Sequence, residues 1–237
     1  RELGEARSAR WQRLADRLEL ALGVDARPAE VGQPLGHVLE HLGERRHGIA
    51  GEEPAPGREE RLGQLAELID LPGDYRILFL AGGAMQQFSL LPLNLAAPGQ
   101  RVGYVDTGYW SARAASEAAL HRPVVSLPVA ASLAVPDDLA YCHLTTNETA
   151  DGLAWPELPV APAGVPLVAD ATADFLCRPL DIRRFGLLYA SAQKNIGVAG
   201  LAVVIVREDL LARSPASLPG IWSYARQAEA DSCVNTP

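Results

Sequence analysis

The chain has 237 residues, of which 48% are hydrophobic and 21% are charged, and its formal net charge is -8 at pH 7. This size and composition are typical of a globular protein with one large domain or slightly more. The acidic balance excludes a basic surface for nucleic acid, and no apolar run approaches the ~20 residues of a membrane span. Three scattered cysteines, Cys142, Cys177 and Cys233, predict reduced thiols in a cytoplasmic protein.

The chain divides by pattern into an N-terminal helical and irregular region, residues 1–60, and a larger domain, residues 61–237. Residues 3–22 have the apolar spacing of an amphipathic helix, and the stretch that follows is rich in glycine, proline and charge. A second helix begins near residue 62 and ends before Pro72.

Beyond Pro72, short apolar runs alternate with helical stretches, which predicts an α/β fold with a mostly parallel, seven-stranded sheet flanked by helices. Several of the runs are unbroken series of aliphatic residues, typical of strands that are covered on both faces. The predicted strands are Ile77–Leu80, Val102–Val105, Val124–Leu127, Ala140–Leu144, Pro166–Ala169, Gly186–Ala190 and Leu201–Val206. Helices are predicted over residues 84–96 and 109–120.

Lys194 is the only lysine of the chain, which also contains 20 arginines. An arginine-favouring genome explains the missing lysines, and one survivor can be due to chance. A guanidinium stays protonated, however, and cannot replace an amine that must attack a carbonyl. Lys194 follows the predicted strand Gly186–Ala190, and a desolvated amine at that position would lose its proton more easily. Ligands of open α/β sheets bind at the carboxyl ends of strands. The residues at the other strand ends therefore decide whether Lys194 is a chance survivor or a reactive amine.

Three further segments follow predicted strands. Gly82-Gly83-Ala84-Met85 allows a tight turn into a helix whose free N–H groups can bind a phosphate, although such a turn can also simply end a strand. Asp170 follows the strand Pro166–Ala169 and can cap the next helix or bind a ligand. Asn147-Glu148-Thr149 has the form of a glycosylation sequon, but a local cap or a ligand contact is the better interpretation without a secretory context.

Pyridoxal phosphate is a cofactor that needs this combination of groups. It requires a lysine amine for its aldehyde, an acid that keeps its ring nitrogen protonated, and N–H donors for its phosphate. Lys194, Asp170 and the Gly82-Gly83 turn have the residue types for these three functions. Trp110 is available to stack on the ring, although alone it would be interpreted as a core residue.

The same segments resemble the phosphoserine aminotransferases, a family of class V, fold-type I pyridoxal-phosphate enzymes. The similarity extends over about residues 70–237, and it implies the large, cofactor-binding domain of a fold-type I transferase. The motifs that carry it are Gly82-Gly83-Ala84-Met85-Gln86-Gln87-Phe88, Pro92-Leu93-Asn94, Tyr104-Val105-Asp106-Thr107-Gly108-Tyr109-Trp110-Ser111, Asn147-Glu148-Thr149-Ala150-Asp151-Gly152, Val168-Ala169-Asp170, Arg178-Pro179-Leu180-Asp181, Ala190-Ser191-Ala192-Gln193-Lys194-Asn195-Ile196-Gly197 and Asn235-Thr236-Pro237.

This resemblance implies roles for nine positions. Lys194 would form the Schiff base with the cofactor and carry protons, and Asp170 would pair with the ring nitrogen. Trp110 would stack on the ring, and Thr149 would contact the ring oxygen. The remaining positions would hold the phosphate, namely Ala84, Met85 and Gln193 from the same subunit and Asn235 and Thr236 from the partner subunit of a homodimer.

The resemblance also implies a reaction, in which L-glutamate donates its amino group to 3-phosphooxypyruvate in serine biosynthesis. The family acts on a related phosphorylated substrate in pyridoxine biosynthesis as well. The sequence differs from the family pattern in three ways, which leave alternatives open. The family's short N-terminal segment and its C-terminal domain have no counterpart here. No residue aligns with the family's substrate-binding histidine–arginine pair. The nearest candidates for that pair are His41, Arg45, Arg46 and His47. The alternatives are another class V enzyme, such as a desulfurase, or a truncated, non-catalytic module that binds the cofactor or dimerises.

Overall fold

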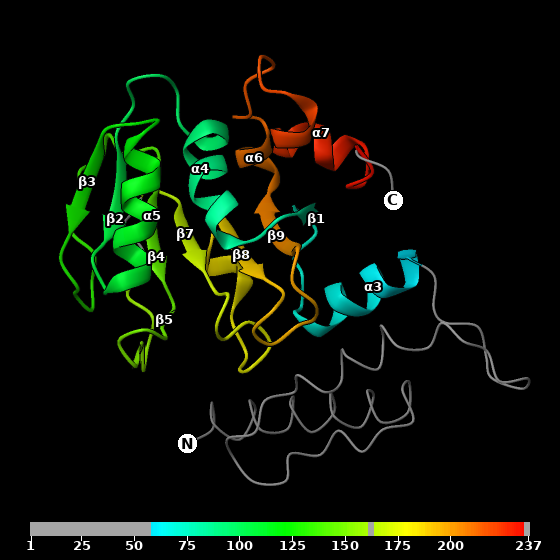
Figure 1. The fold of residues 1–237 in the computed structure, drawn as a ribbon, viewed down its shortest axis with the longest axis horizontal. Coiled ribbons are helices and arrows are strands. Elements are labelled where there is room, and N and C mark those ends of the chain that lie inside the picture. The colour runs from blue at the N-terminus through cyan, green and yellow to red at the C-terminus, as the bar shows by residue number, and fades with distance from the viewer. Residues whose placement is uncertain (1–57, 161–163, 235–237) are drawn as a thin grey trace, which may run out of the picture.

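The computed structural model describes residues 58–160 and 164–234, which form one large sheet, a short hairpin and the helices around them (Figure 1). The helix predicted over residues 3–22 and the candidate residues Asn235 and Thr236 lie outside this part of the chain. No helix within it is long and apolar enough to cross a bilayer.

Seven strands form the main sheet in the spatial order β1-β9-β8-β7-β4-β2-β3. Neighbouring strands from β8 to β3 are parallel, and β9 is antiparallel to both β1 and β8. Six strands therefore share one direction, which confirms the predicted mostly parallel sheet of an α/β fold. The bounds are Tyr75–Ala81 (β1), Val102–Val105 (β2), Val124–Leu127 (β3), Cys142–Thr145 (β4), Leu167–Asp170 (β7), Leu187–Ser191 (β8) and Leu201–Arg207 (β9).

Two helices, α4 (Ala84–Leu95) and α5 (Tyr109–Ala119), lie together across one face of the sheet (Figure 1). α4 contacts β8, and α5 contacts β2, β3 and β4. The opposite face is covered by loops, by a short 3-10 helix and by the end of α3 (Arg58–Leu68), which contributes Leu65. The remaining helices are α6 (Glu208–Leu211), α7 (Tyr224–Glu229) and two 3-10 turns at Ile182–Arg184 and Gly220–Trp222.

The helix α3 confirms the second predicted helix, although it begins at Arg58, four residues before the position expected from the pattern. The division into residues 1–60 and 61–237 stays a prediction, because residues 1–57 lie outside the described part of the chain. α3 leads directly into β1 through the predicted Leu71-Pro72-Gly73-Asp74 segment.

The four central strands β2, β4, β7 and β8 are buried along their whole length. An unbroken aliphatic run predicts this burial, because a parallel strand between two layers has no solvated face. Alternate residues enter two separate cores. Tyr104, Val168 and Tyr189 face α4 and α5, whereas Val105 and Ala169 belong to the core on the other face.

Five strands, namely β1, β4, β7, β8 and β9, end one residue later than the sequence predicted, and the added residue is polar in all of them except β1. β4, β7 and β8 end at Thr145, Asp170 and Ser191, because the backbone of each residue still pairs with a neighbouring strand. A hairpin of β5 (Asn147–Glu148) and β6 (Leu153–Ala154) was not predicted. The polar residues at the strand ends are thus held by the sheet, which makes their positions more rigid than loop positions.

Asn94 in α4 connects this helix to the C-terminal segment. Its Nδ2 donates hydrogen bonds to the backbone oxygens of Leu90 and Trp222, at 2.9 and 2.8 Å. Its Oδ1 accepts from Ser214 Oγ and from Tyr224 N, both at 2.8 Å. Because the side chain is fully buried, water cannot replace these partners.

We predict that Asn94→Ala lowers the free energy of unfolding by about 2–4 kcal/mol, since it leaves buried donors and acceptors unpaired. Urea unfolding followed by circular dichroism measures this change. Ser116→Ala is the control, because it removes an exposed hydroxyl that bonds within α5, and it should change the free energy by less than about 0.5 kcal/mol. Similar losses in the two variants would contradict the assignment of Asn94 as a structural link.

Candidate active site

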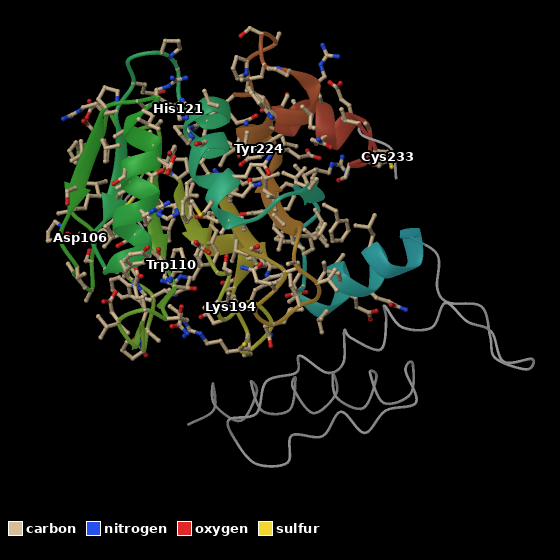
Figure 2. The ribbon with its side chains drawn as sticks, viewed as in Figure 1. Asp106, Trp110, His121, Lys194, Tyr224 and Cys233 are labelled. Carbon is tan, nitrogen blue, oxygen red and sulfur yellow. The ribbon has the colours of Figure 1, made fainter. Side chains whose placement is uncertain are left out.

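A cavity of about 370 Å³ opens at the carboxyl ends of the parallel strands, where ligands of α/β sheets bind. Figure 2 shows two of its residues, Trp110 and Lys194, close to this end of the sheet. Seven of the nine predicted site residues line the cavity, and these are Ala84, Met85, Trp110, Thr149, Asp170, Gln193 and Lys194. The structure therefore brings together residues that the sequence places in five separate segments.

The Gly82-Gly83 turn leads into α4 and forms one wall of the cavity. Gly82 has a φ of +110°, which residues with a side chain rarely adopt, and a Cβ atom on Gly83 would lie only 3.0 Å from Ser191 Oγ. No side chain caps α4 at Gly83. The backbone N–H groups of Ala84 and Met85 therefore stay available to an anion.

Asp170 lines the cavity from the end of β7 and is only 5% exposed. Burial raises the pKa of its carboxyl to about 6, against the lowering effect of hydrogen bonds with Thr172 and Tyr189. The Thr172 backbone N–H donates to Asp170 Oδ1 at 2.9 Å. No cation of the described residues forms an ion pair with Asp170. A cationic group of a ligand would therefore meet a buried acid that has no cationic partner in this part of the chain.

Glu148 positions Trp110 at the cavity by capping α5. The buried carboxylate accepts hydrogen bonds from the backbone N–H groups of Trp110 and Ser111, each at 2.8 Å. It also accepts from Thr107 Oγ1 at 2.8 Å. A negative charge at a helix N-terminus is stabilised by the helix dipole. The interpretation of Asn147-Glu148-Thr149 as a local cap is thus confirmed for Glu148, while Thr149 lines the cavity.

Lys194 lies in the loop between β8 and β9, and its Nζ donates to Thr149 Oγ1 at 3.5 Å. The side chain is exposed in the single chain, so the expectation of a desolvated amine is wrong here. The reason is that β8 ends at Ser191 and the loop beyond it is open to solvent. The next residue is fixed, because Asn195 is buried and its Nδ2 donates to Phe175 O at 2.8 Å.

Four polar residues of the cavity wall received no role in the sequence analysis, namely Thr145, Asn147, Thr172 and Ser191. Thr172 Oγ1 accepts from Ser191 N at 3.1 Å and so joins the ends of β7 and β8. Thr145 Oγ1 is buried and has no hydrogen-bond partner among the described residues, as expected of a group that a bound molecule would satisfy. Extending each predicted strand by one residue would have found Thr145 and Ser191.

A sequence profile of the aminotransferase class-V family matches residues 50–226. The chain belongs to this family. The fold-type I transferase fold expected from the sequence resemblance is confirmed, because solved structures with the same fold are phosphoserine aminotransferases. The cavity at the strand ends is the candidate active site of this family member.

Curated relatives of the chain are named phosphoserine aminotransferase. The protein from Pseudomonas paraeruginosa is 47% identical over 187 residues, which cover 73% of this chain and 51% of the relative. The protein from Stenotrophomonas maltophilia is 40% identical over 210 residues, which cover 84% and 56%. The chain thus spans about half the length of the curated relatives it matches.

Solved structures give the same result. The phosphoserine aminotransferase from Bacillus circulans subsp. alkalophilus has 34% identity and a TM-score of 0.70, with 95% of this chain and 62% of that chain covered. The pyridoxal-phosphate-bound phosphoserine aminotransferase from Trichomonas vaginalis has 32% identity and a TM-score of 0.68, with 78% and 57% covered.

We predict that Asp170→Asn stabilises the chain at neutral pH and not in acid. The folded carboxyl has a pKa of about 6 against the ordinary 3.8, so its contribution to stability is present when it is protonated and is lost as the pH rises through 6. Near pH 7.5 the asparagine variant should be more stable by roughly 2–3 kcal/mol, and the difference should vanish toward about pH 4. Urea unfolding of both proteins across this range measures the effect, and a pH-independent difference would contradict it.

Proposed function

We propose that the chain is the cofactor-binding domain of a phosphoserine aminotransferase that uses pyridoxal phosphate. The reaction would transfer the amino group of L-glutamate to 3-phosphooxypyruvate and form O-phospho-L-serine and 2-oxoglutarate. One observation carries this proposal, which is that seven residues expected to bind the cofactor line one cavity. Identities of 40–47% to proteins named phosphoserine aminotransferase support the substrate pair, and the related substrate of pyridoxine biosynthesis is proposed on the same ground.

The cavity fits pyridoxal phosphate in charge and in hydrogen-bonding groups. The open N-terminus of α4, with Gln193 beside it in the cavity wall, suits a phosphate group. The buried Asp170 suits a protonated ring nitrogen, because the carboxylate lacks a cationic partner in the described part of the chain. The Thr145 hydroxyl needs a hydrogen-bond partner, and Trp110 offers an aromatic surface for a ring.

When bound, pyridoxal phosphate would supply an aldehyde that exchanges amino groups and a ring that accepts electrons. Asp170 would keep the proton on the ring nitrogen, since a buried carboxylate strongly favours a neighbouring cation. Trp110 would cover one face of the ring and exclude water from it. Lys194 Nζ would carry the proton between the amino-acid Cα and C4′ of the cofactor, and Thr149 would orient this amine through their hydrogen bond.

We predict that Lys194→Arg abolishes the covalent capture of pyridoxal phosphate. Because Lys194 is the only lysine, borohydride reduction of the cofactor-saturated chain should attach one cofactor at residue 194, whereas a guanidinium forms no such bond. Intact-mass spectrometry and peptide mapping measure the product, and the visible absorbance of the cofactor is recorded in parallel.

The arginine variant is its own control for folding, because it keeps the positive charge. Its melting temperature without cofactor should stay within about 2 °C of the wild type. Equal modification of both proteins at the same peptide, or none in the wild type, would overturn the cofactor assignment.

An activity measurement separates an enzyme from a non-catalytic module. The cofactor-loaded chain is mixed with L-glutamate and 3-phosphooxypyruvate, and 2-oxoglutarate and O-phospho-L-serine are measured. Turnover that disappears in Lys194→Arg supports the transaminase. Capture of the cofactor without turnover would instead favour a module that binds the cofactor, because the chain spans about half the length of its curated relatives.

A desulfurase is disfavoured by the cysteines. Such an enzyme needs a reactive thiolate near the cofactor. Burial raises the pKa of the Cys142 thiol to about 12, and burial also raises the pKa of Cys177. No cysteine of the described residues lines the cavity. The wall of the site therefore offers hydroxyls, an amide, an amine and a carboxylate instead of a thiol.

We also propose a cytoplasmic homodimer in which Asn235 and Thr236 reach the phosphate of the partner's cofactor. Cys142 and Cys177 form no disulfide, which is consistent with a reducing compartment. Three apolar side chains from segments near the cavity are exposed by about half or more, namely Met85 (49%), Leu153 (57%) and Val198 (80%). A partner subunit placed over these segments would cover them. Sedimentation equilibrium tests the dimer, and a monomer at all concentrations would contradict it.

A further inference from the structure

A row of buried side chains extends from Asp170 beneath α4 and α5, and the proposed reaction does not use it. Tyr189 pairs with Asp170 in the register of β7 and β8, and as a hydrogen-bond partner it lowers the pKa of that carboxyl. The Tyr189 hydroxyl is also 3.0 Å from His143 Nε2. The His143 ring stacks on Tyr104, with centroids 4.7 Å apart. His143 and Tyr189 are completely buried.

The hydrogen bonds of this row have one favourable direction. Burial lowers the pKa of His143 to about 3, so at neutral pH its ring is uncharged and carries a single N–H. Its Nδ1 is buried and has no hydrogen-bond partner among the described residues. A buried N–H without a partner is especially unfavourable, so the hydrogen belongs on Nε2. Nε2–H then donates to the Tyr189 oxygen, and the Tyr189 hydrogen is left for Asp170.

The reverse direction of the hydrogen bond between Tyr189 and His143 would create two unfavourable interactions. If Tyr189 donated to His143, the hydrogen of the ring would be on Nδ1, where no partner exists. The Tyr189 oxygen would then present only lone pairs to the Asp170 carboxylate. Both unfavourable interactions disappear when the hydrogen bonds point toward Asp170.

Uncharged hydrogen-bond donors affect the charge of Asp170 differently from a salt bridge. An arginine beside Asp170 would stabilise the carboxylate but would also neutralise it before any ligand arrived. The uncharged donors Thr172 and Tyr189 favour the ionised form of Asp170 and leave its full negative charge for a ligand. The row therefore suits an acid whose task is to attract a cation in the cavity.

We propose that His143 and Tyr189 are positioning residues that hold Asp170 ionised and directed at the ring nitrogen of pyridoxal phosphate. The identity of the cofactor rests on the proposed function, whereas the hydrogen-bonded row is a property of the chain alone. Neither residue lines the cavity, so both act through Asp170.

Other groups around the row leave this assignment intact. Glu148 is a further charge that acts on Asp170, and it raises the pKa of that carboxyl. Burial raises the pKa values of Tyr104 and Tyr224, which stay uncharged at neutral pH. α4 contributes Phe88, an uncharged ring, and Lys194 lies on the cavity side of Asp170.

Tyr189→Phe tests the row in the cofactor-free chain, because it removes the hydroxyl and keeps the ring that packs against Phe88. Carboxyl carbon NMR should show the pKa of Asp170 rise by about one unit, with the signal identified by its loss in Asp170→Asn. Tyr104→Phe is the matched control, since its hydroxyl bonds to Tyr141 instead, and it should leave this pKa unchanged. No rise in Tyr189→Phe, or an equal rise in both variants, overturns the proposal.

The affinity for pyridoxal phosphate gives a second readout. Near pH 6 the Kd of Tyr189→Phe should exceed that of the wild type about fivefold, and near pH 8.5 the two should agree, because Asp170 is then ionised in both proteins. A packing defect would weaken binding equally at both pH values and would overturn the proposal. If the pKa of Asp170 moves but neither protein binds the cofactor, the row stands and the proposed function fails.

The tautomer of His143 is measured in the wild type, so it decides the direction of the row even if a variant fails to fold. Nitrogen NMR at neutral pH should show an uncharged ring with its hydrogen on Nε2, and the signals are identified by their loss in His143→Gln. A hydrogen on Nδ1 would overturn the proposal.

Discussion

The register between the parallel strands β4, β7 and β8 is the constraint on which the site depends. It aligns Thr145, Asp170 and Tyr189 in one row across three strands. A slip of one residue would turn this row to the opposite face, where Leu144 and Ala169 belong to an apolar core. Such a slip would also move aliphatic residues out of their cores on both faces. The packing that stabilises the sheet therefore holds the polar row in place as well.

The buried acids of this region differ in how completely they are paired. Glu148 accepts three hydrogen bonds at the start of α5. Asp174 accepts from Thr146 and forms a 3.0 Å ion pair with Arg178. Asp170 has no cation among the described residues, and it is the acid of the three that lines the cavity. The contrast separates acids that hold the structure from the acid that is available to a ligand.

The sequence predicted the layers and most strands because aliphatic runs report burial on both faces, and β2 has the predicted bounds Val102–Val105. Strand ends were placed too early at polar residues such as Asp170, since ladder pairing depends on the backbone and not on side-chain polarity. The resemblance predicted which residues meet in the cavity. It did not predict the exposure of Lys194 or the contact of His143 with Tyr189, because both depend on how distant segments pack.

Lys194 combines an anchored backbone with an exposed side chain. Its neighbour Asn195 is tied to Phe175, and the N–H groups of Ile196 and Gly197 both bond to the same carbonyl of Ala192. The start of the loop is thus ordered before any ligand arrives. In the proposed function the amine would meet an aldehyde, and the entropy lost would be mainly that of one side chain, about 2 kcal/mol at most. The amine would then react at an effective concentration far above that of a free amine in solution.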